Sequence, residues 1–131
     1  MRHTTPFLLI SALTAGLLAL PVSAGEALNA AQLKEMFNNK TITAQNPAAG
    51  NKTQLTYFAA DGKIVQKTPT GEKKEGTWRL TDNGQQCITW AGQGEVCSTV
   101  VSRGDGTYQR MVGEKATVLI QKSRAGNLLD E

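Results

Sequence analysis

The sequence lacks most of the residues on which enzyme active sites are usually built. Its 131 residues include one histidine, His3, and two cysteines. Histidine is the common general base near neutral pH and the common partner of a nucleophilic serine or cysteine. With no such pair, no phosphate-binding loop and no metal-ligand spacing, we expect a protein that is not an enzyme and that needs no metal or cofactor.

Aromatic side chains and net charge are also scarce. Aromatic residues make up 5% of the chain, and the formal net charge is +3. So small a positive charge gives no electrostatic argument for nucleic-acid binding. Hydrophobic residues, at 40%, outnumber charged residues, at 19%, which excludes a disordered tail or a coiled coil and is typical of one globular domain.

The first residues have the features of a secretory signal peptide. A short basic start precedes an apolar run from Phe7 to Leu20, and Val22-Ser23-Ala24 supplies the small residues that signal peptidase recognises. As a helix this run rises about 21 Å, short of the roughly 30 Å hydrocarbon core of a membrane. We therefore predict a signal peptide at residues 1–24. Residues 25–131 would form a single small β domain that is periplasmic or secreted, with no stable membrane insertion after cleavage.

Export favours a disulfide between Cys87 and Cys97. In an oxidising compartment an even number of cysteines indicates a disulfide. If the two cysteines face each other across an antiparallel hairpin, Ile88 faces Val96 and the connection has an odd number of residues, such as 91–93. The disulfide then lies on the more polar face of the hairpin, outside the core.

The preceding hairpin leaves two registers open. A three-residue turn at Asp82-Asn83-Gly84, which we favour, places Trp78 beside Ile88. A two-residue turn at Asn83-Gly84 places Trp78 beside Cys87 and buries the disulfide, because a slip of one residue exchanges the two faces of a strand.

Short apolar runs between turn signals predict an all-β fold. A capping-box pattern at Asn29-Ala30-Ala31-Gln32 predicts one short N-terminal helix at about 30–38. Seven or eight strands follow about ten residues apart, and Asp61-Gly62 is the strongest hairpin turn. The connections are too short for parallel crossovers. We predict an antiparallel meander that forms a partly closed barrel or curled sheet, with the helix plugging one end or packing on one face, and a frayed polar tail from about residue 123.

Two sets of residues could contact a ligand. The first set is aromatic, and it forms either the core or a stacking platform: Tyr57, Phe58, Trp78, Trp90 and Tyr108. The second set is basic, and it could line one outer face of the sheet as a patch for an anionic partner: Lys63, Lys67, Arg79 and Arg110. Aromatic residues on strands most often pack in a core, and basic residues on an outer face are most often solvated.

Several short motifs resemble a family of small exported proteobacterial proteins. These motifs are Tyr57-Phe58-Ala59-Ala60-Asp61-Gly62, Gly76-Thr77-Trp78-Arg79, and Cys87-Ile88-Thr89-Trp90 with Cys97 beyond it. The chain is similar, over most of its length after residue 24, to the family catalogued as domain of unknown function 995 or to a close relative. The resemblance implies a periplasmic or secreted β domain with one disulfide, and it implies no activity and no site. The Gly-x-Trp element is also similar to one in lipocalins, although about three predicted strands precede it here.

We expect an exported, non-catalytic binding or interaction protein of the bacterial envelope. Its partner would be an unknown protein, bound through an exposed strand edge, or a small ligand. One alternative is a lipocalin-like carrier of a small apolar ligand in the barrel interior. Another is a hydrolase that uses a carboxylate pair drawn from Asp61, Glu72, Glu75, Glu95 and Asp105. Asp61 and Asp105 lie in predicted turns, where aspartate commonly caps its own backbone.

Overall fold

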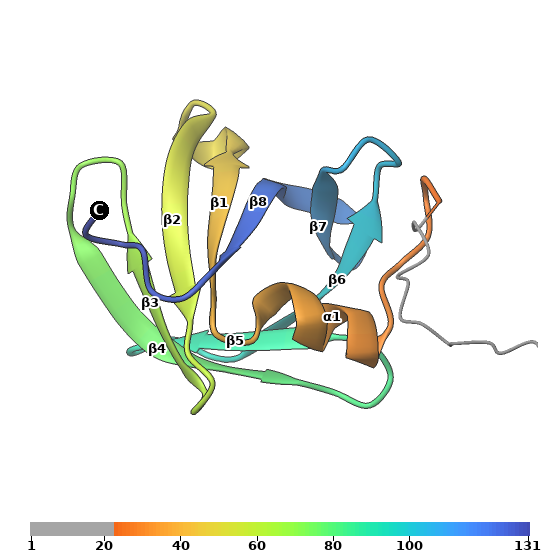
Figure 1. Cartoon of the computed structure of the whole chain (residues 1–131), viewed down its shortest axis with the longest axis horizontal. Helices are drawn as coiled ribbons and strands as arrows, with labels where there is room; N and C mark the ends of the chain where they lie inside the picture. Colours follow the sequence, from red (N-terminus) through yellow and green to blue (C-terminus); the bar gives the residue numbers. More distant parts are fainter. Residues whose placement is uncertain (1–22) are drawn as a thin grey trace, which may run out of the picture.

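The chain folds into a closed antiparallel β-barrel with a short helix at one end (Figure 1). The structure, a computed structural model, describes residues 23–131. All but the last two positions of the predicted signal peptide lie outside the described residues. Within the described part of the chain, no helix is both long and apolar enough to cross a membrane.

The elements follow one another with short connections. Helix α1 spans Ala30–Phe37 and a 3-10 helix, η1, spans Pro47–Ala49. The strands are β1 (Lys40–Asn46), β2 (Lys52–Phe58), β3 (Lys63–Lys67), β4 (Lys73–Leu80), β5 (Gln86–Trp90), β6 (Val96–Ser102), β7 (Tyr108–Val112) and β8 (Lys115–Ala125).

The barrel closes because its last strand is long enough to pair on both sides. Each strand from β1 to β7 pairs antiparallel with the next, and β8 then pairs with both β7 and β1. The pairing with β1 runs from Lys40 opposite Ala125 to Gln45 opposite Leu119. The predicted antiparallel meander of seven or eight strands is thus confirmed. Its eight described strands form a barrel that is closed rather than partly closed.

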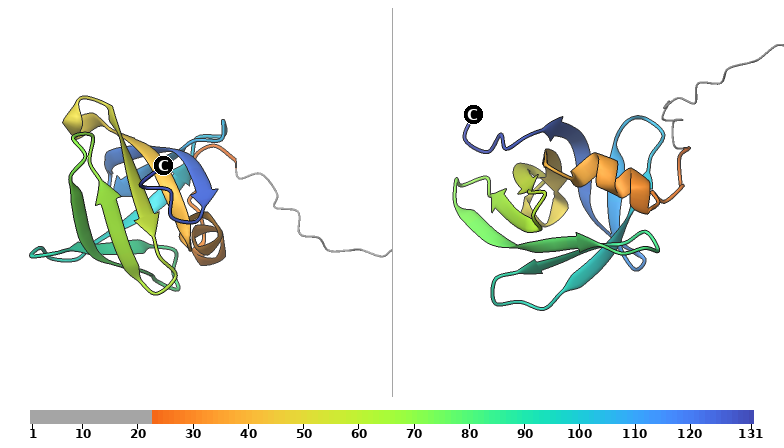
Figure 2. Two further views of the ribbon diagram at one scale, coloured as in Figure 1. Left: turned by 60° about the vertical axis from the view of Figure 1, so that its left-hand side comes forward. Right: turned by 60° about the horizontal axis from the view of Figure 1, so that its bottom comes forward.

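Helix α1 begins at the predicted capping box and covers one end of the barrel (Figure 2). The Asn29 side chain accepts a hydrogen bond from the backbone N–H of Gln32, and the Gln32 side chain accepts one from the N–H of Asn29. Leu33 and Phe37 are fully buried. The Phe37 ring meets the ring of Phe58 edge-on at 4.9 Å. The helix therefore plugs the barrel end, which was one of its two predicted positions.

The hydrophobic core lies inside the barrel and beneath α1. Alternate residues of each strand point inward, as the period of two requires. The buried apolar members of this core are Leu28, Leu33, Phe37, Ile42, Ala44, Phe58, Ile64, Trp78, Ile88, Val100 and Ile120. Phe58 also packs edge-on against Trp78 at 5.3 Å, so an aromatic chain joins the helix to β2 and β4.

The favoured hairpin registers are confirmed. Cys87 lies opposite Cys97, and Ile88 lies opposite Val96. In the preceding hairpin Trp78 lies opposite Ile88, which requires the three-residue turn at residues 82–84. This turn is closed by a hydrogen bond from the N–H of Thr81 to the carbonyl of Gln85. Trp78 therefore faces the interior, while the disulfide lies on the outer face.

The predicted frayed tail from about residue 123 is wrong. Strand β8 continues to Ala125, and the residues beyond it cross the outer face of the barrel. The Thr41 hydroxyl donates a hydrogen bond to the carbonyl of Gly126 and accepts one from the N–H of Leu128. Leu129 is only 2% exposed. A polar composition suggested fraying, but a buried threonine and one leucine are enough to hold the tail in place.

Candidate ligand site inside the barrel

Arg110 on β7 points into the barrel. Its neighbour across the sheet is Val100 on β6, which is fully buried in the core. The guanidinium lies 5.7 Å from the centroid of the Phe37 ring, beneath the helix. Its Nη2 donates a hydrogen bond to Oε1 of Gln86, a fully buried residue on β5. A charged side chain is therefore held inside the barrel by contacts from β5 and α1.

This position corrects the predicted basic patch on an outer face. Successive residues of a strand point to opposite faces of the sheet. The inward-facing residues include Ile64 on β3 and Trp78 on β4, so the alternate positions Lys63, Lys67 and Arg79 lie on the outer face. Arg110 does not join them, because the register of the β6–β7 pairing turns its side chain inward. A five-residue loop, residues 103–107, precedes β7, and the register that it sets decides which face Arg110 occupies.

Arg110 and Gln86 carry hydrogen-bond donors that have no partner. Arg110 Nε and Gln86 Nε2 are both buried without a partner among the described residues. Desolvation lowers the pKa of Arg110 to about 10. Arg110 is nevertheless only half-buried overall, although it lies within the barrel. Its Nε atom itself is inaccessible to solvent.

No carboxylate neutralises Arg110. All eleven acidic residues of the chain are exposed on the outer surface or in loops. The ion pairs of the described residues join Lys73 to Asp130, Arg79 to Glu95 and Arg124 to Glu131, and none involves Arg110. The charge of Arg110 is offset only by the amide oxygen of Gln86 and the face of the Phe37 ring.

A second cation lies on the inward side of β4, near the end of the barrel away from α1. Lys74 is paired with Gln66, whose side chain donates a hydrogen bond of 3.1 Å to the inward Thr56. The Lys74 ammonium lies 4.4 Å from the centroid of the Trp90 ring. Trp90 is half-buried and lies opposite Gly76 in the β4–β5 pairing. This end of the barrel therefore carries an amide and a hydroxyl inside and an exposed cation at its rim.

The five predicted aromatic residues do not form one platform. Phe58 and Trp78 belong to the buried core. Trp90 and Tyr108 are half-buried and pack against that core from different strands. Tyr57 lies on the outer face, opposite Thr41 of β1 and Val65 of β3. Four of the five thus serve the core at least in part, and Trp90 with its Lys74 contact is the member best placed to meet a ligand.

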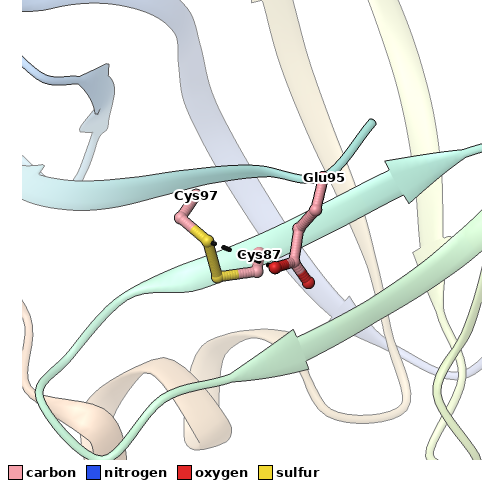
Figure 3. Close-up of side chains that lie close together, drawn as sticks. All are labelled: Cys87, Glu95 and Cys97. Atoms are coloured by element: carbon pink, nitrogen blue, oxygen red, sulfur yellow. Dashed lines mark hydrogen bonds between the residues drawn. A yellow bond between two sulfur atoms is a disulfide. The ribbon is translucent and has the colours of Figure 1, made fainter. Parts of the chain in front are cut away.

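The predicted disulfide between Cys87 and Cys97 is present (Figure 3). The Glu95 carboxylate lies beside it, with Oε1 3.9 Å from the sulfur of Cys97. Two hydrogen bonds of 2.8 Å join this carboxylate to Arg79. These three residues, Cys87, Glu95 and Cys97, form the one cluster of metal-ligand type within the described part of the chain. Because each sulfur is bonded to the other, neither offers the thiolate that binds metals.

The turn aspartates have the local role that the sequence indicated. An Asp61 carboxylate oxygen accepts a hydrogen bond from the N–H of Lys63. Asp105 accepts hydrogen bonds from both the N–H and the hydroxyl of Thr107. These contacts, first the hydroxyl and then the backbone N–H, lower the pKa of Asp105. Both carboxylates close their own hairpin turns.

The sequence reasoning missed Gln86, although a signal for it was present. Trp78 was expected beside Ile88, and period-two alternation places Gln86 on the same face of its strand as Ile88. A glutamine on the inward face of a strand is a buried polar group that needs a partner. Its partner, Arg110, lies two strands away, and no short-range pattern links the two.

The fold and this site define a small closed β-barrel with a helical plug and an unpaired cation in its interior. The chain matches the family described as protein of unknown function (DUF995) over residues 7–123 and belongs to that family, which confirms the resemblance found in its sequence. No curated protein and no solved structure matches the chain.

Proposed function

We propose that the chain is an exported, non-catalytic binding protein of the bacterial envelope that holds a small ligand inside its barrel. The observation that supports this function is Arg110, a charged side chain inside the barrel with an unpartnered nitrogen and partial access to solvent. An eight-stranded barrel has room for its own side chains or for one small ligand. Here the interior side chains leave hydrogen-bonding capacity unused.

Export is supported by the disulfide and by the predicted signal peptide. Disulfides persist mainly in oxidising compartments such as the periplasm and the extracellular space. The Cys87–Cys97 bond is therefore compatible with a periplasmic or secreted protein. The N-terminal charge, apolar run and small residues before Gly25 remain the argument from the sequence.

A small ligand has more support than a protein partner bound at a strand edge. Every strand of the described barrel has a neighbour on both sides, so the sheet offers no free edge for strand addition. Val96, at 52% exposure, is the one large hydrophobic side chain exposed in residues 23–131. Protein interfaces usually need a larger apolar centre than one valine provides.

The interior favours a polar ligand over the apolar one first considered. Its apolar part is already filled near the helix, where Phe37, Phe58 and Trp78 contact one another. Beside this apolar cluster lie Gln86 and Arg110, and the Gln66 amide and the Thr56 hydroxyl lie further along the barrel. The carboxylate hydrolase has no comparable support, because the candidate acids are exposed and two of them cap turns.

Native mass spectrometry tests this function directly. The protein is taken from the envelope fraction of the bacterium that produces it, without refolding, and is measured under native and denaturing conditions. We expect an added mass in the small-molecule range that is lost on denaturation. An added mass of protein size, or a bare chain that also binds nothing from a panel of small metabolites, would contradict the proposal.

A further inference from the structure

We infer that Arg110 and Gln86 bind the anionic group of the ligand, a carboxylate or a phosphate, inside the barrel. This inference rests on the proposed function and specifies its ligand class. The first argument is the balance of donors and acceptors. Arg110 Nε and Gln86 Nε2 both carry hydrogens, both are buried, and both lack an acceptor. A group that satisfies them must present oxygens rather than hydrogens.

The hydrogen bond between Arg110 and Gln86 determines that the free end of the Gln86 amide is a donor. Gln86 Oε1 accepts from the Arg110 guanidinium, so the other end of the Gln86 amide must be the NH2 group. Gln86 is fully buried, and Ser98 on the intervening strand β6 donates to its backbone carbonyl at 3.3 Å. The amide is therefore held by its surroundings, with a donor left over. Charge-assisted hydrogen bonds from such donors to carboxylate or phosphate are among the strongest in proteins.

The distribution of charge supports an anion. All eleven acidic residues are exposed, whereas Arg110 occupies an inward-facing position. A site lined by charges of one sign and walled by protein concentrates the field inside it. Arg110 would supply the positive potential at the site, and no acidic side chain within the barrel would offset it.

A purely structural role explains Arg110 poorly. A buried cation without a carboxylate partner is unfavourable, because desolvation is not repaid by an ion pair. The Phe37 ring and one amide oxygen are weak substitutes for a carboxylate. An apolar side chain would fill the same position beside Val100 without this desolvation penalty. The arrangement is typical of a binding site, in which the empty protein is less stable because polar groups are left free to contact the ligand.

Side-chain NMR tests the inference with simple probes. The Nε–H signal of Arg110 and the Nε2–H2 signals of Gln86 are followed while sodium phosphate, sodium acetate or neutral acetamide is added at constant ionic strength. We expect saturable shifts of both side chains with phosphate or acetate and none with acetamide. A response to acetate alone would assign a carboxylate ligand, and a response to phosphate alone would assign a phosphate ligand.

Three variants make the test specific. R110M removes the cation, and R103M removes an exposed arginine from the β6–β7 turn as a matched control. Q86E keeps the size of the side chain and supplies Arg110 with an internal carboxylate, so it occupies the site from within. We expect binding of the probes to be lost in R110M, weakened about tenfold or more in Q86E, and unchanged in R103M. Q86E gives Arg110 the partner it lacks, so it also serves if R110M fails to fold.

The inference and the proposed function fail in different ways. The anion site would be overturned if the probes caused equal NMR shifts in R110M and R103M. It would also be overturned if high concentrations of phosphate and acetate caused no shift in the native sequence. If native mass spectrometry still found a small molecule, and R110M retained it, the binding function would stand with a neutral ligand. If no small molecule or probe bound at all, both would be wrong.

Discussion

The Cα of Gly76 on β4 lies so close to Thr89 on β5 that a Cβ at position 76 would stand 2.2 Å from the Thr89 carbonyl oxygen. The same Cβ would lie 3.0 Å from the Cα of Trp90. Real Cβ atoms do not approach backbone so closely, so only glycine permits β4 and β5 to pair here. The glycine of the Gly76-Thr77-Trp78 motif is therefore a requirement of barrel closure.

Replacing Gly76 by alanine should destabilise the barrel by about 1–3 kcal/mol, because the backbone of β4 or β5 must move to relieve the overlap. Gly94 provides a matched control, since a Cβ there meets nothing within 4 Å and its φ is not positive. Urea unfolding of the two variants measures the difference. Equal unfolding midpoints for G76A and G94A would show that the strands can separate at Gly76 without loss.

The disulfide should contribute modestly to stability, because it closes a short loop. Cys87 and Cys97 are ten residues apart, and cross-linking so short a loop is expected to stabilise a domain by about 2–3 kcal/mol. Replacing both cysteines by alanine should lower the free energy of unfolding by this amount, and adding a reductant to the native sequence should do the same. Thiol titration of the denatured, unreduced protein should find no free sulfhydryl. Two reactive thiols there would contradict the bond.

The C-terminal tail should depend on the Thr41 hydroxyl. Thr41→Val keeps the shape of the side chain but removes its hydrogen bonds to Gly126 and Leu128, at a loss of about 1–3 kcal/mol. We expect the Leu128 amide to exchange with solvent much faster in this variant. Thr43→Val, two residues along the same strand, should leave the exchange rate unchanged. A Leu128 amide protected equally in both variants would assign the anchoring to Leu129 instead.

Glu95 should titrate below its usual range. The hydrogen bond from Arg79 is the main cause that lowers the pKa of Glu95, and the charge of Arg79 adds to it. A carboxyl group whose pKa is lower in the folded than in the unfolded protein stabilises the fold at pH values above its ordinary pKa. This stabilisation is lost as the pH falls through the lowered pKa. Arg79→Gln should return the pKa of Glu95 toward its ordinary value, measured by carboxyl NMR. An identical titration in both proteins would show that the pair does not persist in solution.

Local signals in the sequence were sufficient to predict the fold. The Asn29–Gln32 pattern located the helix, and the spacing of turn residues gave the antiparallel order. The requirement that Cys87 face Cys97, with Trp78 beside Ile88, gave the register of two hairpins. Each of these inferences depends on residues within about ten positions of one another, where turn geometry and period-two alternation decide the structure.

What the sequence did not reveal depends on contacts between distant residues. Closure of the barrel requires β1 and β8 to meet, and the tail is held by Thr41 at a separation of 85 residues from Gly126. The site pairs Arg110 with Gln86 across an intervening strand. No pattern of apolar and polar residues distinguishes an arginine that points into a barrel from one that points to solvent, because its neighbours on the sheet decide the outcome.

The ligand site should lower the stability of the empty barrel. Arg110→Met combined with Gln86→Leu replaces a poorly compensated cation and its buried amide partner by apolar side chains, and we expect this double variant to raise the free energy of unfolding by about 1–2 kcal/mol. Arg103→Met, at an exposed turn, should change it by less than about 0.5 kcal/mol. The measurement is urea unfolding in a buffer free of phosphate and carboxylates, because an anion bound to the native protein would stabilise the native sequence and hide the difference. A clear loss of stability in the double variant R110M/Q86L would mean that the barrel needs the guanidinium and its amide partner for its own packing.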